Sequence, residues 1–210
     1  MRDKQFLMIP GPTPVPQTAL LEMGKAPLGH RSAEFSEILK ETYANLKWLF
    51  QTKNNVFIFT ASGTGAMEAA LANILNPGDK VLSLVIGNFG ERLAKISTTR
   101  GAEVERMVVD FGQTISVDAL RERLAQDVNK EIKVITLTHS ETSTGCANPL
   151  KDLMAVIREH GALSVVDGVT SVGAMEVKPD EWGIDILISG SQKGFMIPPG
   201  LSFLMAVIEL

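Results

Sequence analysis

The chain has 210 residues, of which 45% are hydrophobic and 21% are charged, and its formal net charge is −4. This composition is typical of a large globular domain, and the acidic balance excludes the basic stripe of a nucleic-acid-binding surface. No apolar run reaches the roughly 20 residues that span a bilayer, so no membrane segment is expected. The single cysteine excludes a disulfide framework, and with no signal peptide visible it predicts a cytoplasmic protein.

The N-terminal segment is too rich in proline for a regular helix or an internal strand. Residues 9–16 read IPGPTPVP, and each proline lacks a backbone N–H and disfavours helix in the residue before it. We therefore predict an extended arm over residues 1–20 and one large domain over residues 21–210. Apolar side chains at helical spacing predict an amphipathic helix over residues 34–51.

From residue 56 onward, apolar runs alternate with helical patterns. The apolar runs show no polar alternation, which is typical of strands buried on both faces of a sheet. This order predicts a three-layer α/β/α domain with a mostly parallel sheet. The predicted strands cover residues 56–59, 81–85, 104–109, 134–137, 163–166, 184–188 and 201–208. The predicted helices that separate them cover residues 64–75, 90–100, 117–127 and 149–160.

The first strand is followed by a segment that suits a small anion. In such a sheet the site lies beyond the carboxyl ends of the strands, and Ser62, Gly63 and Thr64 stand there at the start of a helix. Glycine lets the backbone approach an anion, and a helix N-terminus offers free N–H groups. The alternative is a plain helix cap by Ser62 or Thr64. Walker A and dinucleotide-loop patterns are missing, so a small phosphate fits better than a nucleotide.

Two further strand ends carry residues that suit a flat, charged ligand. Phe89 follows the second strand among glycines and polar residues, where its ring either covers the helix start or stacks on a ligand. Asp167 ends an apolar strand, either as a turn residue or as a buried carboxylate that needs a cationic partner.

The loop at residues 138–145 supplies several hydroxyl groups at the same edge of the sheet. Its His139 and Glu141 match no metal-ligand spacing, so a capped loop is favoured and no metal site is predicted. Cys146, which follows the loop, is expected to fill space rather than to act as a catalytic thiol.

After the apolar run at residues 184–188, a short polar turn leads to Lys193. A lysine in this place is either a strand end whose amine reaches water or a desolvated nucleophile that forms a Schiff base. The sequence thus provides an anion loop, a ring, a carboxylate, a hydroxyl-rich loop and a lysine on different strand ends. Pyridoxal 5′-phosphate uses all five, because its aldehyde condenses with lysine, its ring nitrogen needs a carboxylate and its phosphate needs N–H donors.

The chain resembles the class V aminotransferases, which are pyridoxal-phosphate enzymes of fold type I. It is most similar to the alanine–glyoxylate, serine–glyoxylate and serine–pyruvate aminotransferases. The motifs that carry the resemblance are IPGPT at 9–13, SGT at 62–64 with EAA at 68–70, GNFGER at 87–92, THSETSTG at 138–145, VD at 166–167, and SGSQK at 189–193 followed by PPG at 198–200.

The resemblance implies a role for each candidate in the reaction centre. Lys193 would hold the cofactor covalently and later move the substrate proton. Asp167 would pair with the ring nitrogen. Ser62, Gly63 and Thr64 would hold the phosphate.

It also implies how the cofactor ring is held. Phe89 would stack on the ring where relatives often have tryptophan, and Val169 would press on the opposite face. Thr142 and Gln192 would bond the ring hydroxyl. Gly11, on the arm, would lie near the substrate.

The implied activity is transfer of an amino group from a small amino acid, alanine or serine, to a 2-oxo acid, glyoxylate or pyruvate, by a homodimer. Family members are longer, so we expect this chain to be incomplete at its C-terminus and to lack the small domain whose arginine grips the substrate carboxylate. Arg31 is the nearest basic candidate for binding the substrate carboxylate, but it is more suited to a structural or interfacial role. Two alternatives stay open: a cysteine desulfurase-like reaction, which typically uses histidine at the place of Phe89, and a truncated non-catalytic subunit.

Overall fold

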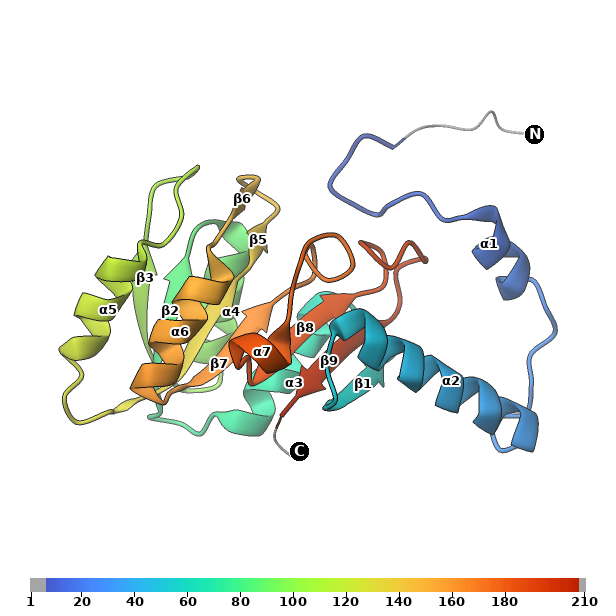
Figure 1. Cartoon of the computed structure of the whole chain (residues 1–210), viewed down its shortest axis with the longest axis horizontal. Coiled ribbons are helices and arrows are strands. Elements are labelled where there is room, and N and C mark those ends of the chain that lie inside the picture. Colours follow the sequence, from blue (N-terminus) through green and yellow to red (C-terminus); the bar gives the residue numbers. More distant parts are fainter. Residues whose placement is uncertain (1–6, 208–210) are drawn as a thin grey trace.

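The computed structural model describes residues 7–207 and has a seven-stranded sheet at its centre (Figure 1). The strand order is β1-β9-β8-β7-β4-β2-β3. Neighbouring strands from β8 to β3 run parallel, and β9 runs antiparallel to both of its neighbours. The strands are β1 (Asn55–Phe59), β2 (Lys80–Val85), β3 (Glu103–Val108), β4 (Ile132–Thr138), β7 (Leu163–Asp167), β8 (Ile186–Gly190) and β9 (Ser202–Ala206). The predicted mostly parallel sheet is confirmed.

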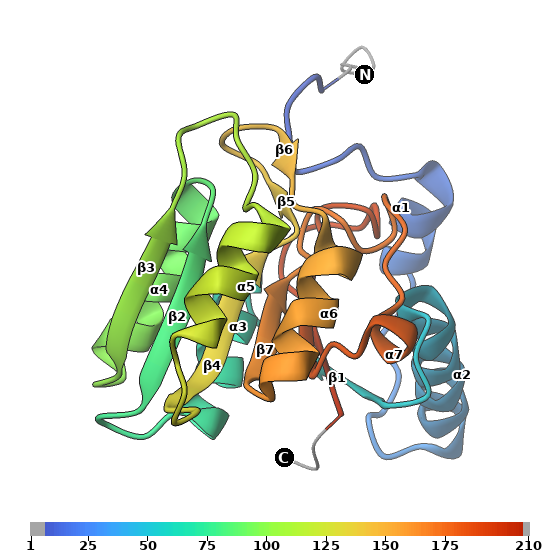
Figure 2. The ribbon, with the colours of Figure 1, turned by 60° about the vertical axis from the view of Figure 1, so that its left-hand side comes forward.

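Helices cover both faces of the sheet and complete the predicted three layers (Figure 2). Helices α3 and α4 pack on one face, and α5, α6 and α7 pack on the other, where α2 adds its apolar side near β1. The helices are α1 (Gln17–Met23), α2 (Ala33–Phe50), α3 (Gly63–Ile74), α4 (Asn88–Thr99), α5 (Val117–Ala125), α6 (Leu150–His160) and α7 (Pro179–Trp182). The short α7 and the hairpin of β5 (Ser140–Glu141) and β6 (Cys146–Ala147) were not predicted.

Local sequence signals set where several helices begin. Ser32, Ser62 and Ser116 each accept a hydrogen bond from the backbone N–H three residues ahead, at the starts of α2, α3 and α5. Such a serine cap is worth about 1 kcal/mol, because it satisfies an N–H group that the helix leaves unbonded. Gly161 ends α6 in the left-handed conformation, as its place in the sequence predicts.

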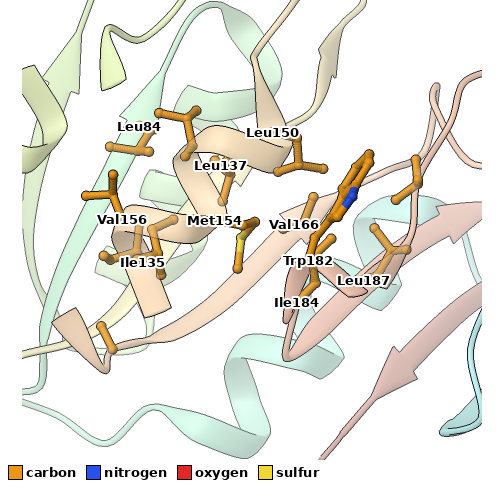
Figure 3. Close-up of a cluster of buried hydrophobic side chains, with 14 of the residues drawn as sticks. Leu84, Ile135, Leu137, Leu150, Met154, Val156, Val166, Trp182, Ile184 and Leu187 are labelled. Atoms are coloured by element: carbon orange, nitrogen blue, oxygen red, sulfur yellow. The ribbon is translucent and has the colours of Figure 1, made fainter. Parts of the chain in front are cut away.

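The larger of the two cores lies under α6 (Figure 3). Leu150 and Met154 of α6 pack with Leu137 of β4 and Val166 of β7, all at most 2% exposed. Full burial of side chains of this size stabilises the fold by about 1.5–3 kcal/mol each. This core fixes the parallel strands in register, and it therefore fixes the relative positions of the loops at their carboxyl ends.

Two predictions about individual elements were wrong in part. The strand over residues 103–108 is not buried on both faces, because β3 is the edge strand and Glu103, Glu105 and Val108 are exposed. Charged side chains on an edge strand also discourage pairing with another sheet. The extended arm predicted over residues 1–20 ends earlier, because no proline follows Pro16 for ten residues and α1 begins at Gln17. Residues 1–6, and Ile208 at the end of the last predicted strand, lie outside the described part.

Candidate active site

A cavity of about 270 Å³ opens at the carboxyl ends of the parallel strands. It is lined by Ser62, Gly63, Thr64, Met67, Phe89, Arg92, Thr142, Asp167, Val169, Thr170, Gln192 and Lys193. All nine cofactor-binding residues predicted from the sequence belong to this lining. Met67, Arg92 and Thr170 also line the cavity and were not predicted from the sequence. Their positions look like those of ordinary helix or loop residues, so no local signal marks them.

Asp167 is a buried carboxylate without a full counter-charge. It ends β7, is 3% exposed, and its Oδ1 accepts a 2.9 Å hydrogen bond from the N–H of Val169. Burial raises the pKa of Asp167 to about 7, and nearby Glu141 opposes ionisation further, whereas Arg92 and Lys193 favour it. A cationic ring nitrogen in the cavity would supply the missing charge, so this residue fits the predicted cofactor.

Lys193 follows β8 in a turn, and its half-buried amine reaches the same cavity. Burial lowers the pKa of Lys193, while the carboxylate of Asp167 acts in the opposite direction. Its Nζ donates a 2.8 Å hydrogen bond to the carbonyl oxygen of Pro10. A lowered pKa leaves more of the neutral amine at neutral pH, and the neutral amine is the nucleophile.

The N-terminal arm docks on the lysine turn, across 180 residues of sequence. Thr13 donates its N–H to the carbonyl of Gln192 at 2.9 Å and its hydroxyl to the carbonyl of Lys193 at 2.9 Å. Gly11 lies so close that a Cβ there would come within 2.7 Å of Lys193 Nζ. Gly11 therefore lies beside the lysine amine, while its predicted place near the substrate stays a prediction, and its φ of +150° favours glycine.

The N-terminus of α3, where the sequence predicts an anion site, lines the cavity. Ser62 caps the helix through a 3.3 Å hydrogen bond from the N–H of Gly65, so the cap that the sequence offered as an alternative is present. Among the described residues, no acceptor bonds the N–H groups of Gly63 and Thr64. A Cβ at position 63 would meet Val169 Cγ2 at 2.9 Å, which explains the glycine. Free N–H groups at the positive end of a helix suit a phosphate.

Phe89 is held in place by a buried acid that lies 52 positions later in the sequence. Glu141 is fully buried, and its Oε2 accepts hydrogen bonds from the N–H groups of Phe89 at 2.9 Å and Gly90 at 3.2 Å. Its Oε1 accepts two more from the N–H and hydroxyl of Ser143. Glu141 therefore caps α4 and fixes the backbone that carries the Phe89 ring, a role that no local pattern in the sequence indicates.

Replacing Glu141 by glutamine is expected to lower the free energy of unfolding by about 2 kcal/mol, because one amide N–H₂ then faces the N–H and hydroxyl of Ser143 and the charged cap is lost. Thermal unfolding of the ligand-free protein measures this loss. Glu159→Gln, an exposed acid on α6, is the matched control. Equal stability of the Glu141 variant and the wild type would contradict the proposed cap.

The remaining candidates from the sequence lie outside the cavity lining. His139 is buried against Trp182, with ring centroids 6.4 Å apart, and burial lowers its pKa to about 4. Cys146 is half-buried in β6, where it packs on the larger core as predicted. Arg31 is exposed in the segment between α1 and α2.

Within residues 7–207, no three His, Cys, Asp or Glu side chains are arranged to hold a metal, and no helix is long and apolar enough to cross a membrane.

Comparison with known proteins gives matches along almost the whole chain. The aminotransferase class-V family model matches residues 6–210. The soluble hydrogenase 42 kDa subunit of Anabaena cylindrica is 50% identical over 204 residues, which are 97% of this chain and 53% of that protein. The serine–glyoxylate aminotransferase of Hyphomicrobium methylovorum is 40% identical over 201 residues, 94% of this chain and 50% of that protein.

A solved structure shows the same fold. The crystal structure of the alanine–glyoxylate aminotransferase from Nostoc sp. superposes with a TM-score of 0.89 at 34% identity, over 98% of this chain and 55% of that one. The chain thus spans about half the length of the relatives that it matches.

Proposed function

The chain belongs to the aminotransferase class-V family, whose members depend on pyridoxal 5′-phosphate, and we propose that it transfers an amino group from a small amino acid to a 2-oxo acid. The names of its relatives favour alanine or serine as the donor and glyoxylate as the acceptor, and the motif resemblance adds pyruvate as a second acceptor. The observation that carries the proposal is the single cavity in which Lys193, Asp167 and the N-terminus of α3 converge.

The charges and hydrogen-bonding groups of the lining residues support binding of the cofactor. Asp167 would face the ring nitrogen, and the N-terminus of α3 with Ser62, Gly63 and Thr64 would hold the phosphate. Phe89 and Val169 would enclose the two faces of the ring. Thr142 and Gln192 would bond the ring hydroxyl. These assignments are supported by the shared cavity and by the burial of Asp167.

The cofactor, when bound, supplies an electron sink for negative charge that develops at the substrate carbon. The protein supplies the proton transfer. Burial lowers the pKa of Lys193, so its neutral Nζ would take the proton from the substrate α-carbon and would deliver it to the carbon that is protonated next. Asp167, ionised beside a cationic ring nitrogen, would keep that nitrogen protonated. The docked arm, through Pro10 and Thr13, orients the lysine turn.

The proposed activity is tested by incubating the cofactor-loaded chain with alanine or serine and with glyoxylate or pyruvate. We expect formation of the new amino acid in proportion to loss of the donor, measured by chromatography, and none with Lys193→Ala. A loaded chain that turns over no pair of small amino acid and 2-oxo acid would contradict the proposal.

A second candidate, a non-catalytic subunit, is favoured by one specific observation. A relative that is 50% identical is named as a subunit of a soluble hydrogenase. Cofactor binding without turnover of any amino donor would support this candidate over the first.

A desulfurase reaction is disfavoured, because Cys146 lies outside the cavity lining and Phe89 stands where those enzymes typically have histidine. Sulfide release from cysteine tests it directly.

The homodimer is supported by exposed apolar side chains on the N-terminal helix α1. In Figure 1, α1 lies apart from the sheet. Leu20, Leu21 and Met23 of α1 are 52%, 65% and 63% exposed. Large apolar side chains left exposed on one short helix favour a subunit contact. Sedimentation equilibrium, which measures the mass of the assembly, tests the homodimer.

A cytoplasmic location is proposed from the single unpaired cysteine.

A further inference from the structure

Arg92 joins the N-terminal ends of α3 and α4, which both line the cavity. It lies on α4, one turn beyond Phe89, and its side chain is part of the cavity lining. Its Nη1 donates a 2.9 Å hydrogen bond to the hydroxyl oxygen of Thr64, at the N-terminus of α3. The guanidinium also lies over the ring of Phe89, 4.6 Å from the ring centroid. Two contacts from different elements therefore hold the planar cation at the mouth of the cavity.

The charges around Arg92 are unbalanced without a ligand. Two helix N-termini, those of α3 and α4, meet at this cavity, and each carries partial positive charge. Glu141 neutralises the end of α4, but α3 has no acidic residue in its first turn. Within residues 7–207, no carboxylate forms an ion pair with Arg92, whereas Arg106 nearby pairs with Glu91. A cation beside a positive helix end is unfavourable unless an anion lies between them.

The hydrogen-bond directions favour the same site. The hydroxyl oxygen of Thr64 accepts from Arg92, which leaves its proton free to donate to a third group. One N–H of the guanidinium is used by Thr64, and the other four remain for a further acceptor. The N–H groups of Gly63 and Thr64 lie at the same helix end. These donors belong to residues that line one cavity, and a group with several acceptor oxygens would satisfy them together.

We propose that Arg92 is a phosphate-binding residue of the cofactor site, and that it completes the anion subsite formed by Ser62, Gly63 and Thr64. This inference rests on the proposed function and deepens it, because it assigns the phosphate a cationic partner within the chain. Phe89 then has two roles, since its ring orients the guanidinium as well as contributing to the cavity wall.

The test compares binding of pyridoxal 5′-phosphate with binding of pyridoxal, which lacks the phosphate. Dissociation constants are measured by absorbance titration for the wild type, for Arg92→Gln and for Arg92→Lys. Arg92→Gln is expected to weaken binding of the phosphate form about tenfold to a hundredfold, the range for a hydrogen bond to a charged group, and to change pyridoxal binding less than about twofold. Arg92→Lys keeps the positive charge but lacks the planar pair of N–H donors of the guanidinium. An intermediate loss of affinity for pyridoxal 5′-phosphate is therefore expected.

Lys95→Gln is the matched control, because it removes one exposed positive charge from the same helix away from the cavity. It should leave both dissociation constants unchanged. Equal losses for the two ligands in Arg92→Gln would show that Arg92 acts through the ring contact alone and would overturn the inference. Unchanged binding of both ligands would overturn it as well. If the wild type binds neither ligand, the proposed function itself fails.

A second measurement needs no variant. Phenylglyoxal modifies exposed arginines, and peptide mass mapping gives the rate at Arg92. Inorganic phosphate is expected to slow the modification at Arg92 several-fold relative to chloride at equal ionic strength, and to leave the rate at Arg100, the exposed end of α4, unchanged. Equal rates at Arg92 in phosphate and chloride would contradict a phosphate site there.

Discussion

Replacing Lys193 by alanine is expected to abolish the covalent attachment of pyridoxal 5′-phosphate that borohydride makes permanent, and to reduce transamination by at least about 10²–10⁴-fold. Its Nζ reaches the cavity, burial lowers its pKa, and it is held 2.8 Å from the carbonyl oxygen of Pro10. Loss of the amine therefore removes both the attachment point and the proton carrier. Mass spectrometry of the reduced protein measures the attachment.

Two further variants make this result specific. Lys193→Arg keeps the positive charge and a donor for the carbonyl oxygen of Pro10, but the guanidinium stays protonated and forms no covalent bond to an aldehyde. It should lose the label as completely as the alanine variant, while the arm stays docked. Lys151→Ala, at an exposed position of α6, should keep the full label. A borohydride-stable label in the Lys193→Ala protein would exclude Lys193 from this role.

Replacing Asp167 by asparagine is expected to stabilise the ligand-free protein and to weaken cofactor binding at the same time. The pKa of Asp167 rises from about 4 in the unfolded chain to about 7 in the folded state because the carboxyl group is buried. The folded protein thus holds a proton that the unfolded chain releases, and stability falls as the pH rises from about 4 to about 7. Asparagine has no charge to bury and still accepts the N–H of Val169.

The expected gain at pH 8 is about 2 kcal/mol, or roughly 5 °C in Tm for a chain of this size, and it should shrink as the pH falls toward 5. Thermal unfolding of both proteins across this pH range measures the gain. Affinity for pyridoxal 5′-phosphate should fall at least about tenfold, because asparagine cannot offset a cationic ring nitrogen. Asp110→Asn, which changes an exposed acid outside the cavity lining, is a control for charge alone. A gain that does not depend on pH would contradict the assigned burial effect.

The two predictions about the cofactor site share one physical basis. Asp167 and Lys193 both pay an electrostatic cost for their positions in the ligand-free protein, as their shifted pKa values show. Residues that are strained in this way often mark functional sites, because a bound ligand relieves the strain. The buried carboxylate therefore has a reason to be retained even though asparagine would make the folded chain more stable.

The periodicity of the sequence was sufficient to locate the main strands and the longer helices. Continuous apolar runs and serine caps are local signals, so the strands from Lys80–Val85 to Ile186–Gly190 and the start of α3 at Ser62 could be predicted within a few residues. The rule that sites lie beyond strand ends is sufficient to group Ser62, Phe89, Asp167 and Lys193 from the sequence. The match of motif order to the class V aminotransferases led to the same set.

The sequence by itself determined the order of elements and the residue types at each strand end, since these depend on neighbours a few positions apart. Only the tertiary structure decided which strand lies at the edge, and so why Glu103 is exposed while Val81 is buried. It also decided that Glu141 caps the helix of Phe89 and that Arg92 bonds Thr64. These contacts join residues 28 to 52 positions apart, and no local pattern specifies them, because they depend on how the packed core sets the strands side by side.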